Sequence, residues 1–163
     1  VQDFGNAFST FIAQNYGAGK TERIQTGIRS AVGTAVLFCL MVSAAVCLFA
    51  RPLMGLFVER GEAEIISIGV GYLRIEGAFY LGIGCLFLLY GLYRAVAMPA
   101  MSVVLTIVSL GTRVLLAYTL SAIPAIGVVG IWWSVPIGWF LADAVGFGYY
   151  ALCRKKIEAR LTA

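Results

Sequence analysis

The sequence predicts an all-helical protein that crosses a membrane several times. Hydrophobic residues make up 61% of the chain and charged residues 12%, whereas charged residues alone reach about 25% in soluble domains. The mean hydropathy is +0.91. Four apolar segments are long enough to cross the hydrocarbon core, which takes about 20 residues of helix. Basic residues gather in the gaps between these segments. Together these observations predict an all-α polytopic membrane protein.

The first part of the chain is expected to hold a partial span and a complete one. Residues 1–16 are apolar and end at the sequence YGAGK, where glycines and a charge turn the chain at the membrane surface. The chain opens without Met, so we expect it to be a piece of something longer. Residues 30–50 form an uncharged span. The linker 51–64 combines a short amphipathic turn with charged residues, which predicts an interfacial segment.

The second part of the chain is expected to hold three further spans. Residues 65–93 form a span longer than a bilayer requires, so it must tilt or project. The next span covers residues 99–121 and has Pro99 in its first turn, where proline is well tolerated. A short turn reverses the chain into the last span, residues 128–152. Residues 153–163 are predicted to form a cytoplasmic tail.

The net charge of +4 is explained by membrane topology, so we expect no nucleic-acid partner. If the Lys20 loop faces the cytoplasm, eight basic residues outside the spans lie on that side and two, Arg51 and Arg60, on the other. Cytoplasmic loops usually carry such an excess of Lys and Arg. The C-terminus is therefore predicted to be cytoplasmic. Lys20, Arg23 and Arg94 are predicted to be cytoplasmic anchors of helix ends.

No motif in the chain indicates an enzyme. Gly19-Lys20-Thr21 matches the end of a phosphate-binding loop, but Gln14 occupies the position of its first glycine and no strand precedes it. The four cysteines lie in or at the end of apolar segments, and the chain has no His to complete a zinc site. We therefore predict no enzymatic activity, no resident cofactor and no metal centre.

Five ionisable residues lie inside the predicted spans. Such a side chain costs at least about 2.5–3.5 kcal/mol at the bilayer centre, so it usually faces the protein interior or a water-filled cavity. Each of these residues is therefore a candidate functional residue. They are Asp3, Arg74, Glu76, Arg113 and Asp143.

Two interpretations of Glu76 remain open. Residues two positions apart on a helix point about 200° apart, so Arg74 and Glu76 cannot comfortably pair. Arg113 lies at a similar depth in its own span and is the available cation. Glu76 is either a carboxylate that takes up and releases a proton or cation, or a permanent structural partner of Arg113. A structural role is favoured for Arg74 and Arg113.

The other two acids receive different interpretations. Asp143 lies in the inner half of its span, and a structural role as a charge partner inside the bundle is favoured. Asp3 shares a helix face with Asn6 one turn later, so two polar groups point the same way. Asp3 is therefore a second candidate for binding a cation or proton.

Aromatic residues near the charged positions are candidates for lining a substrate cavity. The electron-rich faces of aromatic rings attract organic cations. This predicts that Tyr72, Phe79 and Tyr80 line a cavity. Packing, or an interfacial belt, is the favoured interpretation for Trp132 and Trp133, which sit near the outer end of their span.

Four stretches resemble the C-terminal half of the multidrug and toxic compound extrusion (MATE) transporters of the bacterial branch. They read FIAQNYGAGKTERI, YLRIEGAFYLGIGCLFLLYGLYRA, MSVVLTIVSLGTRVLLAY and GIWWSVPIGWFLAD. The resemblance covers essentially the whole chain. The QNYGAGK element and the later YLRI element are fairly specific in combination.

The resemblance implies a twelve-helix antiporter of two six-helix lobes in the cytoplasmic membrane, with both termini cytoplasmic. Such proteins export organic cations and other drugs in exchange for Na⁺ or H⁺. This chain would be part of the C-terminal six-helix lobe, from the end of helix 8 to helix 12. Its partners would be the lipid bilayer, a small organic cation and the missing N-terminal lobe.

The resemblance also bears on single residues. Na⁺-coupled members use acidic residues in the C-terminal lobe, including one in helix 10. Glu76 is the only acid inside the matching span. Relatives commonly carry glycines after the YR of this helix, whereas this chain has Ala95 and Ala97, which would stiffen the turn.

Two other functions remain open at this point. A lipid-linked oligosaccharide or polysaccharide flippase of the same broad fold would line its cavity with several basic residues for a pyrophosphate group. Arg74 and Arg113 keep that interpretation open. A membrane scaffold without transport activity would hold its ionisable residues in permanent pairs.

Overall fold

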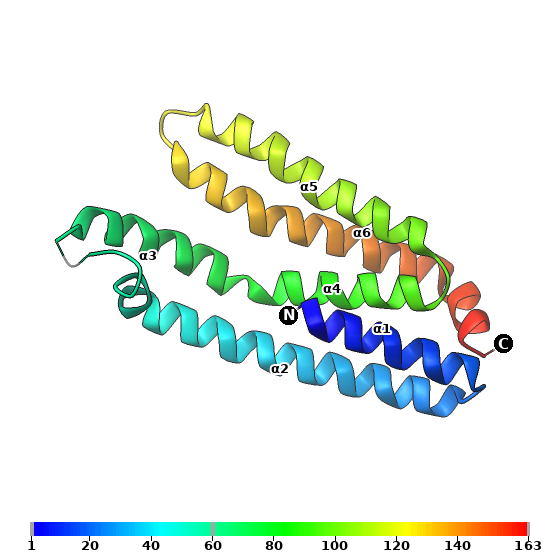
Figure 1. The fold of residues 1–163 in the computed structure, drawn as a ribbon. Coiled ribbons are helices and arrows are strands. Elements are labelled where there is room, and N and C mark those ends of the chain that lie inside the picture. The colour runs from blue at the N-terminus through cyan, green and yellow to red at the C-terminus, as the bar shows by residue number, and fades with distance from the viewer. Residues whose placement is uncertain (1, 60, 163) are drawn as a thin grey trace.

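The computed structural model describes residues 2–59 and 61–162, and this part of the chain is helical without strands (Figure 1). The helices follow one another as an up-and-down bundle. They are α1 (Gln2–Gly17), α2 (Thr21–Met54), α3 (Ala63–Ala78), α4 (Tyr80–Ala95), α5 (Pro99–Ser121) and α6 (Val128–Thr162).

The outer surfaces of the long helices are apolar. Large side chains such as Leu40 of α2, Leu115 of α5 and Leu141 of α6 are exposed. Within the described part of the chain, three helices are long and apolar enough to cross a membrane, and the pair α3 and α4 makes a fourth candidate if it counts as one span. An apolar surface of this extent needs lipid or another part of a protein to cover it.

Several helices extend beyond the predicted spans. Helix α2 begins at Thr21, before the predicted start at residue 30, and continues to Met54, so it includes the first part of the predicted linker 51–64. Helix α6 continues to Thr162 through most of the predicted tail 153–163. Hydropathy marks only the part of a helix that lipid surrounds. The backbone hydrogen bonds of a helix continue into the polar flanking residues.

The predicted span 65–93 is divided into two helices. Helices α3 and α4 meet at Phe79, whose φ of −106° and ψ of 18° are not helical, and their axes differ in direction by 47°. We expected tilting or projection to accommodate the length of this segment, and the structure shows a bend as well.

Helix α2 is distorted at Phe49, shortly before Pro52. Proline removes a backbone donor and clashes with the preceding turn, which explains the distortion.

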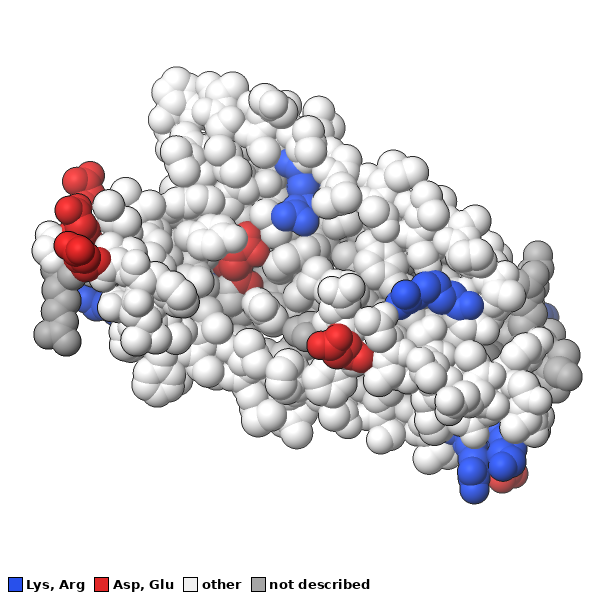
Figure 2. All heavy atoms as spheres, viewed as in Figure 1, with Lys and Arg blue, Asp and Glu red and all other residues white. Residues whose placement is uncertain are grey.

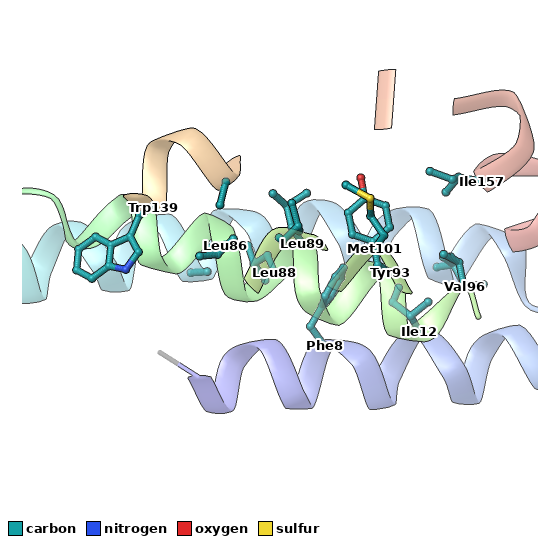
Figure 3. Close-up of a cluster of buried hydrophobic side chains, with 14 residues drawn as sticks. Phe8, Ile12, Leu86, Leu88, Leu89, Tyr93, Val96, Met101, Trp139 and Ile157 are labelled. Carbon is teal, nitrogen blue, oxygen red and sulfur yellow. The ribbon is translucent and has the colours of Figure 1, made fainter. Parts of the chain in front are cut away.

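Helix α4 lies at the centre of the bundle. It contacts α1, α2, α5 and α6, and many of its residues are buried. Figure 3 shows the core side chains along α4, with α1 on one side and α6 on the other. The labelled core residues are Phe8, Ile12, Leu86, Leu88, Leu89, Tyr93, Val96, Met101, Trp139 and Ile157.

Close contacts on two sides of α4 join it to the backbones of α1 and α6. A Cβ atom at Gly91 would lie 2.6 Å from the carbonyl oxygen of Gly5 in α1, and one at Gly5 would lie 2.6 Å from the carbonyl oxygen of Phe87. On the side of α6, the buried hydroxyl of Tyr93 donates a hydrogen bond to the carbonyl oxygen of Gly146, at 2.6 Å. These contacts fix α1 and α6 relative to α4.

The turns gather at the two ends of the bundle. The α1–α2 turn, the α4–α5 turn and the C-terminal part of α6 lie at one end, and the α2–α3 and α5–α6 connections at the other (Figure 1). The α4–α5 turn contains Ala97 at a φ of 55°, a conformation that glycine adopts at lower energy than alanine. Lys20 and Arg23 lie exposed at the same end.

Substitution of Gly91 by alanine is expected to destabilise the protein, because the new methyl group would overlap the backbone of α1. Overpacking of this kind typically costs about 1–3 kcal/mol. The check is the melting temperature of the purified protein in detergent. Gly111→Ala is the matched control, since a Cβ atom there meets nothing within 4 Å and alanine favours the helix. Equal melting temperatures for the two variants would contradict the α1–α4 contact.

Candidate functional site

Glu76 lies in the last turn of α3, immediately before the break at Phe79. Its side chain is 9% exposed, and its Oε1 atom is buried without a hydrogen-bond partner among the residues that the structure describes. A buried carboxylate oxygen without a partner is costly and calls for a functional explanation. The break places this carboxylate inside the bundle, where the helix ends and its last carbonyl groups lack partners within the helix.

The surroundings of Glu76 contain one cation and two phenol groups. Arg113 of α5 is close enough to act on Glu76 electrostatically. Tyr72 interacts in the same way with Glu76, Tyr80 and Arg113. The structure thus brings together four residues that the sequence analysis selected.

A permanent pair with Arg113 was one of the two open interpretations of Glu76, and the described structure shows no ion pair between the two side chains. No salt bridge joins the two side chains in the described part of the chain, and Oε1 of Glu76 remains without a partner. The guanidinium is close enough to attract the carboxylate. Glu76 therefore has electrostatic support from Arg113 and keeps an oxygen available for another ligand.

Helix α6 determines where the side chain of Arg113 lies. A Cβ atom at Gly138 would overlap the Cγ atom of Arg113 and would lie 2.8 Å from the carbonyl oxygen of Ser109. Gly138 therefore leaves room for the aliphatic part of the arginine between α5 and α6. A long cationic side chain can be kept inside the bundle when its stem packs on apolar surface in this way.

The aromatic residues near the break pack mainly against α6. Phe79 lies between Trp133 and Phe140, with ring centroids 5.3 Å and 5.8 Å away. The ring centroids of Tyr72 and Trp132 are 6.1 Å apart, nearly edge to face. Phe79 thus acts as a packing residue at the break. Tyr72 is 42% exposed and keeps a ring surface that a ligand can reach.

Two side chains of α2 bind backbone carbonyl groups near the break. The hydroxyl of Ser43 donates a hydrogen bond to the carbonyl oxygen of Gly77 at 2.5 Å. The thiol of Cys47 lies 3.8 Å from the carbonyl oxygen of Arg74. Backbone groups cannot stay without partners in lipid, so these contacts make the break possible. The sequence analysis did not select Ser43, although a hydroxyl inside an apolar segment was an available signal.

No hydrogen bond or ion pair joins the other ionisable candidates to Glu76 in the described structure. The side chains of Arg74 and Asp3 are exposed. Asp143 of α6 is 6% exposed, and its Oδ1 atom has no hydrogen-bond partner in the described structure. Cys85 of α4 interacts with Asp143 electrostatically. The structure thus shows no ion pair for Asp143 among the described residues.

Charged side chains are sparse on the middle of the bundle. Figure 2 shows isolated acidic and basic groups there, set in an uncharged surface, with mainly acidic groups at one end and mainly basic groups at the other. Arg94 lines a cleft beside α1 and donates a hydrogen bond from Nη2 to Oδ1 of Asn6, at 3.1 Å. Arg94, predicted as an anchor, thus also contacts a neighbouring helix. No group of three or more metal-binding side chains occurs among the described residues.

Comparison with known proteins places the chain in a family. The MatE family model matches residues 2–119. The chain belongs to the MatE family. This match includes Glu76, the break and most of α5.

Two relatives extend the comparison over nearly the whole chain. A probable multidrug resistance protein of Bacillus subtilis (strain 168), YoeA, is 26% identical over 153 residues, which cover 93% of this chain and 33% of that protein. A multidrug resistance MATE family transporter of the MOP superfamily, solved in an inward-facing conformation, matches with a TM-score of 0.80 and 25% identity, over 96% of this chain and 35% of that one. This MatE chain therefore spans about a third of each relative.

Ser43→Ala is expected to lower the stability of this MatE protein, because the carbonyl oxygen of Gly77 would lose its donor at the break. A hydrogen bond of this kind contributes about 0.5–1.5 kcal/mol. The melting temperature in detergent tests this, with Ser67→Ala as the control because Ser67 is exposed on α3. A melting temperature for Ser43→Ala at or above that of the control would show that the hydroxyl does not support the break.

Proposed function

We propose that this chain forms part of an antiporter that exports organic cations across the cytoplasmic membrane in exchange for Na⁺ or H⁺, with Glu76 as the coupling carboxylate. Membership of the MatE family and the multidrug resistance names of two relatives support the class of protein. The observation that carries the proposal is the buried Oε1 atom of Glu76, which lacks a hydrogen-bond partner among the described residues.

The end of α3 favours a cation beside Glu76. The C-terminus of a helix carries a partial negative charge, because its last carbonyl groups are not used within the helix. Glu76 adds a full negative charge at the same place. Broken helices in transporters commonly present such carbonyl ends to a coupling ion. A proton or Na⁺ would neutralise a charge that is expensive to leave buried.

Arg113 and Tyr72 suggest how the site exchanges ligands. When the coupling cation leaves, the carboxylate of Glu76 is stabilised by the nearby charge of Arg113. The partly exposed ring of Tyr72 gives an organic cation an aromatic surface beside the carboxylate. The coupling cation and the organic cation would thus compete for one negative charge, which links export of one to import of the other.

The rest of the transporter is also a proposal. Alternating access requires two bundles that rock about a shared site, so this chain needs a second lobe, and the lipid bilayer surrounds both. The end of the bundle that carries Lys20, Arg23 and the C-terminal part of α6 is assigned to the cytoplasm, because basic residues predominate there.

Glu76→Gln is expected to abolish gradient-driven efflux, because the amide keeps the size of the side chain but cannot bind a proton or Na⁺ as a carboxylate does. The measurement is ethidium efflux from vesicles that contain the complete protein, under imposed Na⁺ and pH gradients. We expect a decrease of at least about tenfold, the loss of a single charged interaction.

Glu64→Gln is the control, because Glu64 is exposed in the first turn of α3 and should leave efflux unchanged. Normal insertion of both variants is checked by their amounts in the membrane fraction. Efflux by Glu76→Gln at the level of Glu64→Gln would remove Glu76 from the coupling mechanism.

A further inference from the structure

A second polar site lies at the other end of α4, away from Glu76. Helices α1, α4 and α5 enclose a cleft of about 340 Å³, lined by polar and apolar side chains. Helix α4 contacts both α1 and α5. Helix α4 has 16 residues and is therefore about 24 Å long, so this cleft and the carboxylate of Glu76 are separate places in the fold.

Arg94 is the only charged residue that lines this cleft in the described part of the chain. Its Nε atom donates a hydrogen bond to the carbonyl oxygen of Tyr90 at 3.3 Å, and its Nη2 atom donates one to Oδ1 of Asn6 at 3.1 Å. These bonds hold the guanidinium across the gap between α4 and α1. Because guanidinium has five N–H donors, further donors remain for a ligand.

The guanidinium of Arg94 has no counter-charge in the described structure. No carboxylate lines the cleft, and no ion pair joins Arg94 to an acidic side chain that the structure describes. Arg94 is exposed near the end of α4, so its remaining N–H donors are accessible to an anionic group. Arginine binds the oxygen atoms of phosphate and carboxylate with two parallel hydrogen bonds.

Hydroxyl groups add to the polar side of the cleft. Oγ1 of Thr106 donates a hydrogen bond to the carbonyl oxygen of Ser102 at 2.9 Å and lies 3.3 Å from the hydroxyl oxygen of Tyr90. The buried Oγ atom of Ser102 has no hydrogen-bond partner among the described residues. Both residues of α5 line the cleft together with Arg94. An anion beside Arg94 would have the hydroxyl of Tyr90 as a further donor within the same cleft.

The remaining wall of the cleft is apolar. Phe87 and Val103 line it on α4 and α5, and Val103 is 57% exposed. A cleft with a cation at one side and apolar surface at the other fits a molecule that has the same two parts. A small inorganic anion would leave the apolar wall without a partner.

We propose that the cleft between α1, α4 and α5 binds the anionic group, a phosphate or carboxylate, of an amphipathic molecule, with Arg94 as the main ligand. The apolar part of that molecule lies against Phe87 and Val103. This site is additional to the cation site at Glu76 and does not depend on the transport activity. The anionic group comes either from an anionic phospholipid or from a water-soluble amphipathic anion.

The test measures binding to the complete protein, purified in a neutral detergent, by native mass spectrometry. The probes are phosphatidylglycerol, phosphatidylcholine and dodecyl phosphate. At least one of the two anionic probes, phosphatidylglycerol or dodecyl phosphate, is expected to bind Arg94→Gln about tenfold more weakly than the wild type, since a charge-assisted hydrogen bond is lost. Binding of phosphatidylcholine should be equal in both proteins.

Two further variants separate this site from general effects of charge and folding. Lys20→Gln removes one positive charge at the exposed α1–α2 turn and should retain wild-type binding. Val103→Trp keeps Arg94 but fills the apolar wall, so it should also lose the anionic probe. If Arg94→Gln fails to fold, Val103→Trp decides the question alone.

The outcomes distinguish the two sources. Dependence of phosphatidylglycerol binding on Arg94 and Val103 supports the site and assigns it to a membrane lipid. The same dependence for dodecyl phosphate alone supports the site and assigns it to a water-soluble amphipathic anion. The proposal is overturned if the binding of neither anionic probe changes with these substitutions. That result is expected if another helix with an acidic residue fills the cleft.

Discussion

Close packing around α4 is the constraint on which the rest of this structure depends. Lipid chains are as apolar as the side chains of a membrane helix, so the hydrophobic effect does not hold such helices together, and small residues that allow close contact take over that role. Gly5 and Gly91 bring α1 and α4 into backbone contact, and the hydroxyl of Tyr93 binds the backbone of α6. The two candidate sites lie near opposite ends of this helix, which contacts all five other helices.

The break between α3 and α4 links packing to function. A continuous helix through Phe79 would satisfy its own backbone, whereas the broken one needs Ser43 of α2 as a donor for the carbonyl oxygen of Gly77. The break requires this support from a neighbouring helix, and it places Glu76 at a helix end inside the bundle. The aromatic contacts of Phe79 with α6 hold the bend from the other side. Movement of α2 or α6 would therefore change the surroundings of the carboxylate.

The two proposed sites carry opposite charges at opposite ends of α4. Glu76 has Arg113 nearby without an ion pair in the described structure, and Arg94 is bound to Asn6 and not to an acid. A buried carboxylate oxygen without a partner is costly, and the exposed guanidinium of Arg94 keeps N–H donors free, which is why each is interpreted as a binding group. A cation at Glu76 would reduce the electrostatic cost of the buried carboxylate, and an anion at Arg94 would accept hydrogen bonds from donors that the bundle leaves free.

The amino-acid sequence by itself determined the class of the protein, the apolar segments that become helices, and the family. It also singled out Glu76 and Arg113, because isolated charges in apolar segments are conspicuous. The break at Phe79, the role of Ser43 and the cleft around Arg94 were decided only by the tertiary structure. Each depends on atoms from helices distant in the chain, and hydropathy contains no information about which side chain of one helix meets which carbonyl group of another. Local composition decides where a helix can exist in lipid, and contacts between helices decide where it bends and which charges stay without a partner.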